Sequence, residues 1–257
     1  MRERKFILSI MILILLLFNI QKLKADSFEV KPEKILINFT YHGANLKITG
    51  QGNCAGKDFV INILSTHKEK ATFKKIEKVA NLIWMKTGDL HFENVPFFYH
   101  VYSTRPVEEI LTKKDLEEYS LTFDSLKKEV NLFPVKDENQ KNFLWQEFIK
   151  YKSKYHLYAY EVVPYNCKGE GQNQLLEISI PWPYQAPPGV YQIKIYEISN
   201  RKIENIAEKI VEVEKVGLVK FLTDFAQNHA LIYGVFSVLI ALISGFLVGL
   251  IFKKGGH

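Results

Sequence analysis

The sequence predicts a mainly β fold: an immunoglobulin-like antiparallel sandwich with an inserted α-hairpin, followed by one C-terminal transmembrane helix. Three observations predict it. Apolar residues alternate with polar ones in short runs over residues 27–103 and 175–213. The period changes to 3.6 residues over residues 106–159, and an uncharged apolar run lies near the end of the chain. Period two is typical of half-buried strands, and period 3.6 of amphipathic helices.

The charge is concentrated at the two ends of the chain. The sequence has 257 residues, with 34 Lys and Arg against 28 Asp and Glu. Subtracting the seven bases and one acid of residues 1–25 and 230–257 leaves 27 bases and 27 acids for residues 26–229. The middle of the chain therefore has no net field to attract nucleic acid, and we expect no nucleic-acid partner.

The N-terminus predicts a secretory signal peptide over residues 1–25. Arg2, Arg4 and Lys5 precede an uninterrupted apolar run over residues 6–18, and Ala25 offers a cleavage site. Such a run forms roughly 20 Å of helix, which is short of the ~30 Å hydrocarbon core of a bilayer. An uncleaved anchor is the alternative, and it would leave the following domain on the same side of the membrane.

The exported part, residues 26–217, is predicted to begin with strands. The clearest runs cover residues 34–38, 44–49 and 58–65, with glycines between them. Weaker runs predict strands at residues 71–78, 82–85 and 97–103.

An α-hairpin is predicted over residues 106–159. Thr112 and Asp115 resemble a capping box, and apolar residues then recur at spacings of three and four until Pro134. Asp137 and Gln140 predict the start of a second helix, whose apolar face continues to Tyr158. The stretch 120–122 is a possible break in the first helix.

Strands return at residues 175–180, 190–199 and 203–213. Between the first two, residues 181–189 contain four prolines. Because proline cannot donate to a β-ladder, we expect this stretch to form a loop that crosses between the sheets or around an edge.

The C-terminal run predicts a transmembrane helix over residues 230–252. Its 23 residues carry no charge and end at Lys253 and Lys254, which begin a tail over residues 253–257. By the positive-inside rule the tail is cytoplasmic, so residues 26–229 lie on the other side of the membrane, which agrees with the signal peptide. Residues 218–229 predict an amphipathic juxtamembrane segment. A buried core helix is the alternative for residues 230–252.

One face of the predicted span carries small side chains. Four of them recur every four residues: Ser237, Ala241, Gly245 and Gly249. Such a face lets another helix approach closely, which predicts self-association or a membrane-protein partner besides the lipid bilayer. Small residues are also common in membrane helices that have no partner.

Motifs of catalysis and of metal binding are absent from the sequence. The seven histidines never fall at the close spacings of metal ligands, and no CxxC is present. No nucleophile elbow or phosphate loop occurs, and the carboxylate pairs are adjacent, which points their side chains apart on a helix. We therefore expect no enzyme activity, no metal and no cofactor.

Cys54 and Cys167, the two cysteines, both lie in polar, glycine-containing stretches. Export to an oxidising compartment favours their pairing. Two separate thiols are the alternative.

A resemblance to a known family rests on a stretch before the predicted insertion and on the C-terminal region. The stretch contains Asn94, Val95, Pro96, Phe98, Tyr99, Ser103, Arg105 and Pro106. With the later Glu214–Gly217 and Leu231–Gly234 segments, it resembles an uncharacterised family of alphaproteobacterial transmembrane proteins. The likeness covers most of residues 30–254, but the two cysteines depart from it.

The resemblance implies a signal peptide, a strand-rich exported domain and one terminal span, and it implies association with a TauE/SafE-like permease. We therefore expect a membrane-anchored periplasmic accessory protein. For Arg105 the alternatives are a structural ion pair and contact with a partner. For the whole protein, the alternative is a solute or metal receptor with a cleft lined by Trp145, Tyr151, Tyr155 and His91 or His100.

Overall fold

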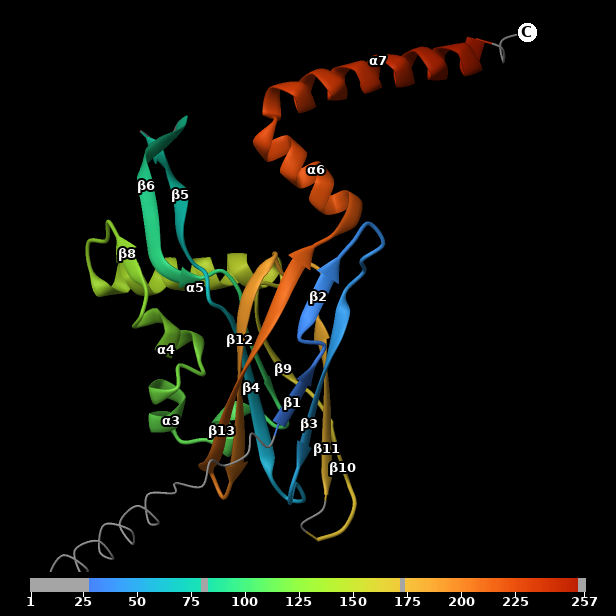
Figure 1. The fold of residues 1–257 in the computed structure, drawn as a ribbon. Helices are drawn as coiled ribbons and strands as arrows, with labels where there is room; N and C mark the ends of the chain where they lie inside the picture. Colours follow the sequence, from blue (N-terminus) through green and yellow to red (C-terminus); the bar gives the residue numbers. More distant parts are fainter. Residues whose placement is uncertain (1–27, 80–82, 172–173, 254–257) are drawn as a thin grey trace, which may run out of the picture.

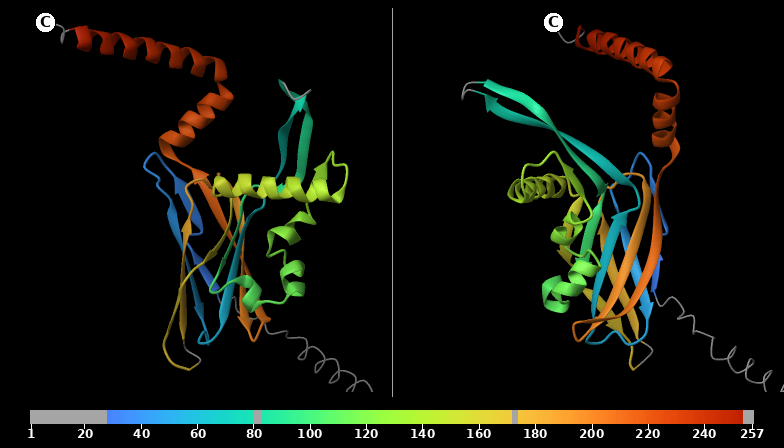
Figure 2. Two further views of the ribbon diagram at one scale, coloured as in Figure 1. Left: turned by 180° about the vertical axis from the view of Figure 1, so that it is seen from behind. Right: turned by 90° about the vertical axis from the view of Figure 1, so that its left-hand side faces the viewer.

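The chain is mainly β, as the sequence predicts, and it ends in a long helix that leaves the folded domain (Figure 1). The computed structural model describes residues 28–79, 83–171 and 174–253. Within them, two facing sheets form a sandwich, a layer of helices covers the outer face of one sheet, and a long hairpin extends from the same side (Figure 2). The predicted signal peptide lies outside the described residues.

The first sheet has the strand order β1-β3-β11-β10 and is antiparallel throughout. Its strands are β1 (Phe28–Lys31), β3 (Ala44–Gln51), β10 (Tyr165–Lys168) and β11 (Leu175–Trp182). The expectation that residues 181–189 form a loop is wrong for Pro181 and Trp182, which belong to β11, and for Gly189, which begins the later strand β12. Proline is tolerated there because β10 pairs only as far as Ile178, which leaves the end of β11 with a single neighbour.

The second sheet has the strand order β2-β13-β12-β4-β7-β9. Its strands are β2 (Lys34–Ile37), β4 (Asp58–Ser65), β7 (Tyr99–Ser103), β9 (Tyr158–Val162), β12 (Gly189–Ser199) and β13 (Lys202–Lys215). The two outermost pairs, β13 with β2 and β7 with β9, are parallel, whereas the inner pairs are antiparallel.

The middle strands β4 and β7 of this second sheet are buried on both faces. On β4, Phe59 and Ile61 point toward the first sheet, while Val60 between them points toward the helical layer. All five residues of β7 are buried. Tyr102 lies in the sandwich core together with Phe98, the residue before the strand, whereas Tyr99 and Val101 lie in the other core. The protein therefore has two hydrophobic cores that share one sheet, and burial of apolar surface stabilises both.

The third sheet has the order β5-β6-β8 and consists mainly of a long hairpin. Its strands are β5 (Lys68–Val79), β6 (Ile83–Pro96) and β8 (Asn131–Phe133). The sequence predicted only the shorter runs 71–78 and 82–85. The hairpin extends toward the end of the domain from which the last two helices leave (Figures 1 and 2).

The prediction of one continuous first helix in the α-hairpin is wrong. In its place the chain forms α2 (Val107–Ile110), α3 (Lys113–Glu118), α4 (Phe123–Lys127) and then strand β8. The capping box of Thr112 and Asp115 is present, but a second capping box at Thr122 starts a new helix. Between them Ser120 takes a positive φ of 51° and Leu121 is fully buried. The burial of Leu121 and the two capping boxes therefore outweigh the regular spacing of apolar residues that predicts one continuous helix.

The second predicted helix is present as α5 (Glu138–Lys154), and Asp137 caps it by accepting from Gln140 N. It ends earlier than predicted, because His156 has a positive φ of 53° that breaks helical geometry. Tyr158 therefore belongs to β9 and is buried in the second core.

The chain leaves the sandwich through β13 and forms α6 (Gly217–Asn228) and α7 (Ala230–Lys253). No residue of α6 is buried, and its apolar residues include Leu218 and Phe221. In α7, Ala230–Leu250 is long and apolar enough to span a membrane, with a mean hydropathy of 2.5 and none of it buried. This agrees with the predicted juxtamembrane segment and span.

Candidate functional site

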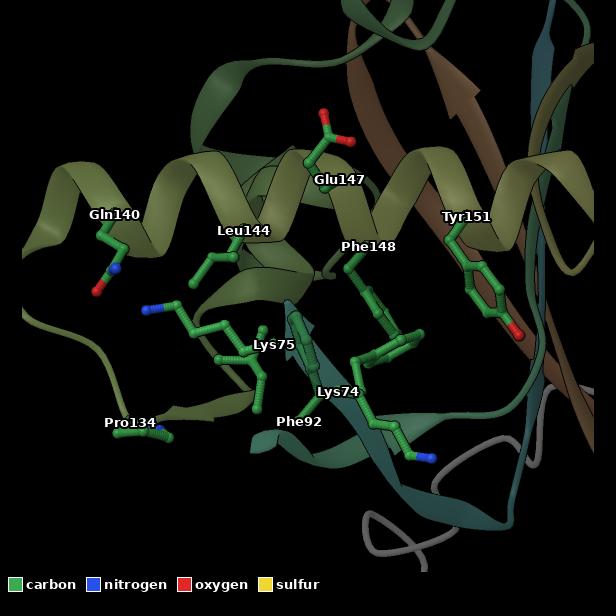
Figure 3. Close-up of a pocket in the computed structure, with 11 residues that line it drawn as sticks. Lys74, Lys75, Phe92, Pro134, Gln140, Leu144, Glu147, Phe148 and Tyr151 are labelled. Carbon is green, nitrogen blue, oxygen red and sulfur yellow. The ribbon is translucent and has the colours of Figure 1, made fainter. Parts of the chain in front are cut away.

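An apolar groove of about 280 Å³ lies between the long hairpin and α5 (Figure 3). Phe73 of β5 and Phe92 of β6 form one wall, and Leu144 and Phe148 of α5 form the other. Leu90 and Pro134 complete the apolar lining. The groove exists because β5 and β6 turn their apolar residues toward the predicted apolar face of α5.

The aromatic rings of the groove contact one another closely. The ring of Phe92 stacks on that of Phe148 with 4.4 Å between the centroids. Phe73 meets Phe92 edge to face at 5.6 Å and Tyr151 at 5.2 Å. Because rings packed on several sides cannot rotate freely, the apolar lining is already formed in the structure.

Polar side chains surround the opening. Lys75 extends toward Gln140, whereas Lys74 extends on the side of Tyr151 (Figure 3). The one carboxylate among the lining residues, on Glu147, lies 2.5 Å from Lys150 Nζ. The opening of the groove therefore carries charged side chains, whereas its interior is apolar.

A buried lysine fixes the hairpin to α5. Lys152 is only 2% exposed; its ammonium contacts the carboxylate of Glu69 on β5 and donates to Phe97 O at 3.3 Å. Nζ also lies 4.7 Å from the centroid of the Phe97 ring. Burial lowers the pKa of Lys152 from its ordinary value. A buried charge requires such partners, so this contact holds the two walls of the groove in place.

The structure does not bring the residues of the predicted receptor cleft together. Tyr151 lines the groove and contacts Tyr155, with 5.0 Å between ring centroids. Trp145 is 1% exposed and belongs to the second core. His91 lies beside Thr72, with 3.1 Å from Nδ1 to Oγ1, and His100 is on another sheet. Only Tyr151 of the predicted set faces the groove.

His100 is a structural residue of the sandwich. Its Nε2 donates to His156 O at 3.0 Å and its Nδ1 lies 3.1 Å from the Tyr102 hydroxyl. Burial lowers the pKa of His100 to about 4, so the ring is neutral at pH 7. Within residues 28–79, 83–171 and 174–253, no three His, Cys, Asp or Glu side chains come close enough together to hold a metal ion.

The stretch over residues 94–106 is a structural junction. Asn94 takes a positive φ of 63° and donates from Nδ2 to Glu129 O at 2.7 Å. Val95 is fully buried, and Pro96 O accepts from the Tyr158 hydroxyl at 2.7 Å. The stretch thus ties the hairpin to both the helical layer and β9.

The end of that stretch is fixed to the start of β4. Arg105 donates to both carboxylate oxygens of Asp58, from Nε at 2.9 Å and from Nη2 at 2.5 Å. The hydrogen bonds with Arg105 lower the pKa of Asp58. Ser103 is buried, and Pro106 is the residue that precedes α2. Of the two roles considered for Arg105, the structure shows the ion pair.

Cys54 and Cys167 form a disulfide with 5.9 Å between their Cα atoms, which is the pairing the sequence favours. The disulfide joins the loop before β4 to strand β10. It therefore links a segment that precedes the helical layer in the sequence to one that follows it. The small residues Ser237, Ala241, Gly245 and Gly249 all lie on the exposed surface of α7.

Over residues 27–254, the chain matches the family described as "Putative transmembrane protein (Alph_Pro_TM)". The chain belongs to this family. No curated protein and no solved structure matches it. The family match covers the sandwich, the helical layer and α7 together, so the span is part of the family's architecture. An immunoglobulin-like relationship of the sandwich remains a prediction.

The groove of this Alph_Pro_TM protein was not predicted from sequence, although half of it could have been. Leu144, Phe148 and Tyr151 belong to the apolar face that the spacing predicts for the second helix, which is α5. Leu90 and Phe92 alternate with Asp89 and His91, which is a period-two signal for the strand that the prediction omitted. That β6 would lie against α5 depends on the tertiary fold and has no local signal.

Proposed function

We propose that this protein is an accessory protein of a bacterial inner membrane, in which α7 anchors a periplasmic domain that binds another membrane protein. Its C-terminus lies in the cytoplasm, and it carries out no catalysis of its own. The apolar N-terminal run after Arg2, Arg4 and Lys5 supports export, and Lys253 and Lys254 support the orientation of the span.

The observation that carries the proposal is the exposed small-residue face of α7. None of the span is buried by the described part of the chain, so its surface is available to lipid or to another helix. Glycine and alanine let two backbones approach closely, which strengthens van der Waals packing between helices in a bilayer. The partner we propose is a TauE/SafE-like permease, and self-association is the competing outcome.

The test is to purify the intact protein gently from its native membrane and identify the bound proteins by mass spectrometry. Replacing Gly245 and Gly249 by Leu should abolish co-purification of the partner, because the added side chains separate the helices. Replacing Ile243 and Leu247 by Phe is the matched control, since each lies about 200° around the helix from the glycine two residues after it. Partner recovery that the glycine variant leaves unchanged would exclude this face as the contact.

The second candidate function, a periplasmic receptor, is favoured by the groove between the hairpin and α5. A ligand that binds only the folded protein raises its midpoint of thermal unfolding. Thermal melts of the intact protein against divalent metals and small sulfur oxyanions test this function. A ligand that raises the midpoint in the native protein but not in a Leu144→Glu variant would establish a receptor.

A further inference from the structure

A second pocket, of about 450 Å³, lies on the outer face of the second sheet, between the base of the hairpin and helices α3 and α4. Figure 1 shows these elements. Strands β4 and β12 form its floor, and residues of the hairpin and of the helical layer form its walls. Its described lining residues differ from those of the groove beside α5, so the two sites are separate. We call it the Asn62 pocket, after a buried residue of β4 on its floor.

The Asn62 pocket contains a buried amide that lacks a partner. Asn62 is 3% exposed, and its Oδ1 accepts no hydrogen bond from the described part of the chain. Two other buried polar side chains of the lining have protein partners. Ser65 Oγ donates to His67 O at 2.9 Å, and the Tyr99 hydroxyl donates to Ser120 O at 2.6 Å. An unpaired buried acceptor costs free energy, so we expect the partner of Asn62 to come from outside the protein chain.

The chemistry of an amide indicates which group would satisfy Asn62. Its side chain carries an acceptor, Oδ1, and a donor, Nδ2, and rotation about the Cβ–Cγ bond exchanges their positions. A group that both donates and accepts therefore suits the amide in either orientation. A hydroxyl group does both, whereas an ammonium group only donates and a carboxylate only accepts.

The charges around the pocket compensate one another. Two lysines and two glutamates line it. Lys194 Nζ lies 3.5 Å from Glu208 Oε1, and Lys68 Nζ lies 3.9 Å from Glu129 Oε2. Glu118, the other lining carboxylate, is exposed, so water screens its charge. The lining therefore favours an uncharged ligand over a cation or an anion.

Aromatic and aliphatic surface lies beside these polar groups. Tyr196 of β12 and Tyr119, which follows α3, meet edge to face with 5.4 Å between their ring centroids. Leu64 and Leu126 add aliphatic surface. A sugar ring presents hydroxyl groups at its edge and C–H groups on its faces, and the C–H groups pack favourably on such a lining.

We propose that the Asn62 pocket binds an uncharged polyhydroxylated solute of the size of a monosaccharide. One hydroxyl group of the solute pairs with the Asn62 amide, and its C–H face packs beside Tyr119 and Tyr196. A volume of about 450 Å³ is in the range of small-molecule sites. This binding goes beyond the proposed accessory function, because it needs neither a partner protein nor the small-residue face of α7.

The test uses the intact protein in phosphatidylcholine nanodiscs and saturation-transfer NMR, which detects ligand protons in contact with the protein. The probes are D-glucose, D-galactose and D-mannose, each compared with its 2-amino sugar and its uronic acid. These analogues add a positive or a negative charge to the same ring. We expect saturable binding of at least one neutral hexose at millimolar concentration, and binding several times weaker for its charged analogues.

Variants separate binding in the pocket from binding elsewhere. Asn62→Leu keeps the size of the side chain but removes both hydrogen-bonding groups, so it should weaken binding about tenfold. Leu64→Trp leaves Asn62 in place but fills the pocket, and it should abolish binding. Asn166→Leu, at an exposed position of β10, is the matched control and should preserve binding.

Thermal unfolding checks that the variants fold. Because Asn62→Leu also removes an unpaired buried acceptor, the ligand-free variant should unfold at a midpoint no lower than that of the native protein. A lower midpoint, with no hexose bound by the native protein, would mean that a buried water is the partner of Asn62 and would overturn the proposal.

Three further results would overturn it. The first is that none of the three neutral hexoses binds saturably. The second is that Asn62→Leu and Leu64→Trp leave the binding unchanged. The third is that an amino sugar or a uronic acid binds more tightly than its neutral hexose, which would assign a charged ligand to the pocket.

Discussion

The two hydrophobic cores share one sheet but are built differently. In the sandwich core, apolar residues of long paired strands meet across two sheets, and a disulfide joins a loop to one of the strands. In the second core, one face of the shared sheet meets short irregular segments, and individual polar contacts hold these in place, such as that between the Tyr99 hydroxyl and Ser120 O at 2.6 Å. Paired strands are enough to define a sandwich, whereas the irregular layer depends on specific polar contacts between single residues.

The two cores can be followed separately because each contains one buried tryptophan: Trp182 in the sandwich core and Trp145 in the second core. In a Trp84→Phe background, these two residues are the remaining tryptophans of the chain. Keeping one at a time gives a fluorescence reporter for each core during urea unfolding of the intact protein.

The largest effect is expected from removing the disulfide, which the structure places in the sandwich. Replacing Cys54 and Cys167 by Ala should lower the free energy of unfolding by about 4–5 kcal/mol, because their separation of 113 positions closes a long loop in the unfolded chain. Urea titration with the Trp182 reporter measures this. An unchanged free energy of unfolding would show that the cystine does not form in the native protein.

The next largest loss of stability is expected from removing the buried contact between Lys152 and Glu69, which holds the hairpin to α5 beside the second core. Lys152→Ala should lower the free energy of unfolding by about 3–5 kcal/mol, because it leaves the carboxylate of Glu69 without its buried partner. The Trp145 reporter should respond more than the Trp182 reporter. Lys152→Met combined with Glu69→Gln should lose less than Lys152→Ala, since no charge then remains unpaired. Equal losses would mean that packing of the lysine stem, and not its charge, holds the hairpin.

His100, on the sandwich strand β7, should make the free energy of unfolding depend on pH. The pKa of His100 is about 4 in the folded protein and 6.5 in its ordinary state, so the unfolded chain binds more protons between these values. Stability is complete above pH 6.5 and decreases as the pH falls to 4, by about 3 kcal/mol for this group. His100→Phe should remove this component, as measured by urea titrations across the pH range. A slope that is the same in the variant would assign the pH dependence to other groups.

The smallest effect is expected at the surface junction between β4 and β7. The Arg105 side chain is 56% exposed, so solvent screens its ion pair with Asp58. Arg105→Ala should raise the pKa of Asp58 toward its ordinary value, which NMR titration of the carboxyl measures, and both tryptophan reporters should shift little. If a partner protein no longer co-purifies with this variant, Arg105 contacts that partner in addition to forming the ion pair with Asp58.

The contrast between the cores also explains what could be predicted from the sequence. Strands β4 and β12 were predicted nearly to the residue, because β4 is a short, mainly apolar run between polar residues and β12 alternates apolar with polar residues along most of its length. Strands β9 and β10 were missed, since they are short and most of their side chains are partly or fully exposed. The stretch 120–122 was recognised as a possible break in the first helix, but the buried site that Leu121 occupies is supplied by other elements and has no local signal.

The last strand of the sandwich leads directly into the membrane anchor. Strand β13 is bonded on one side to β12 and on the other to β2, and only Val216 separates it from α6. Tension transmitted from the bilayer through α7 therefore acts along a strand held by ladders on both edges. Those hydrogen bonds are loaded in shear and must break together, so the attachment can bear mechanical force without peeling the domain open one bond at a time.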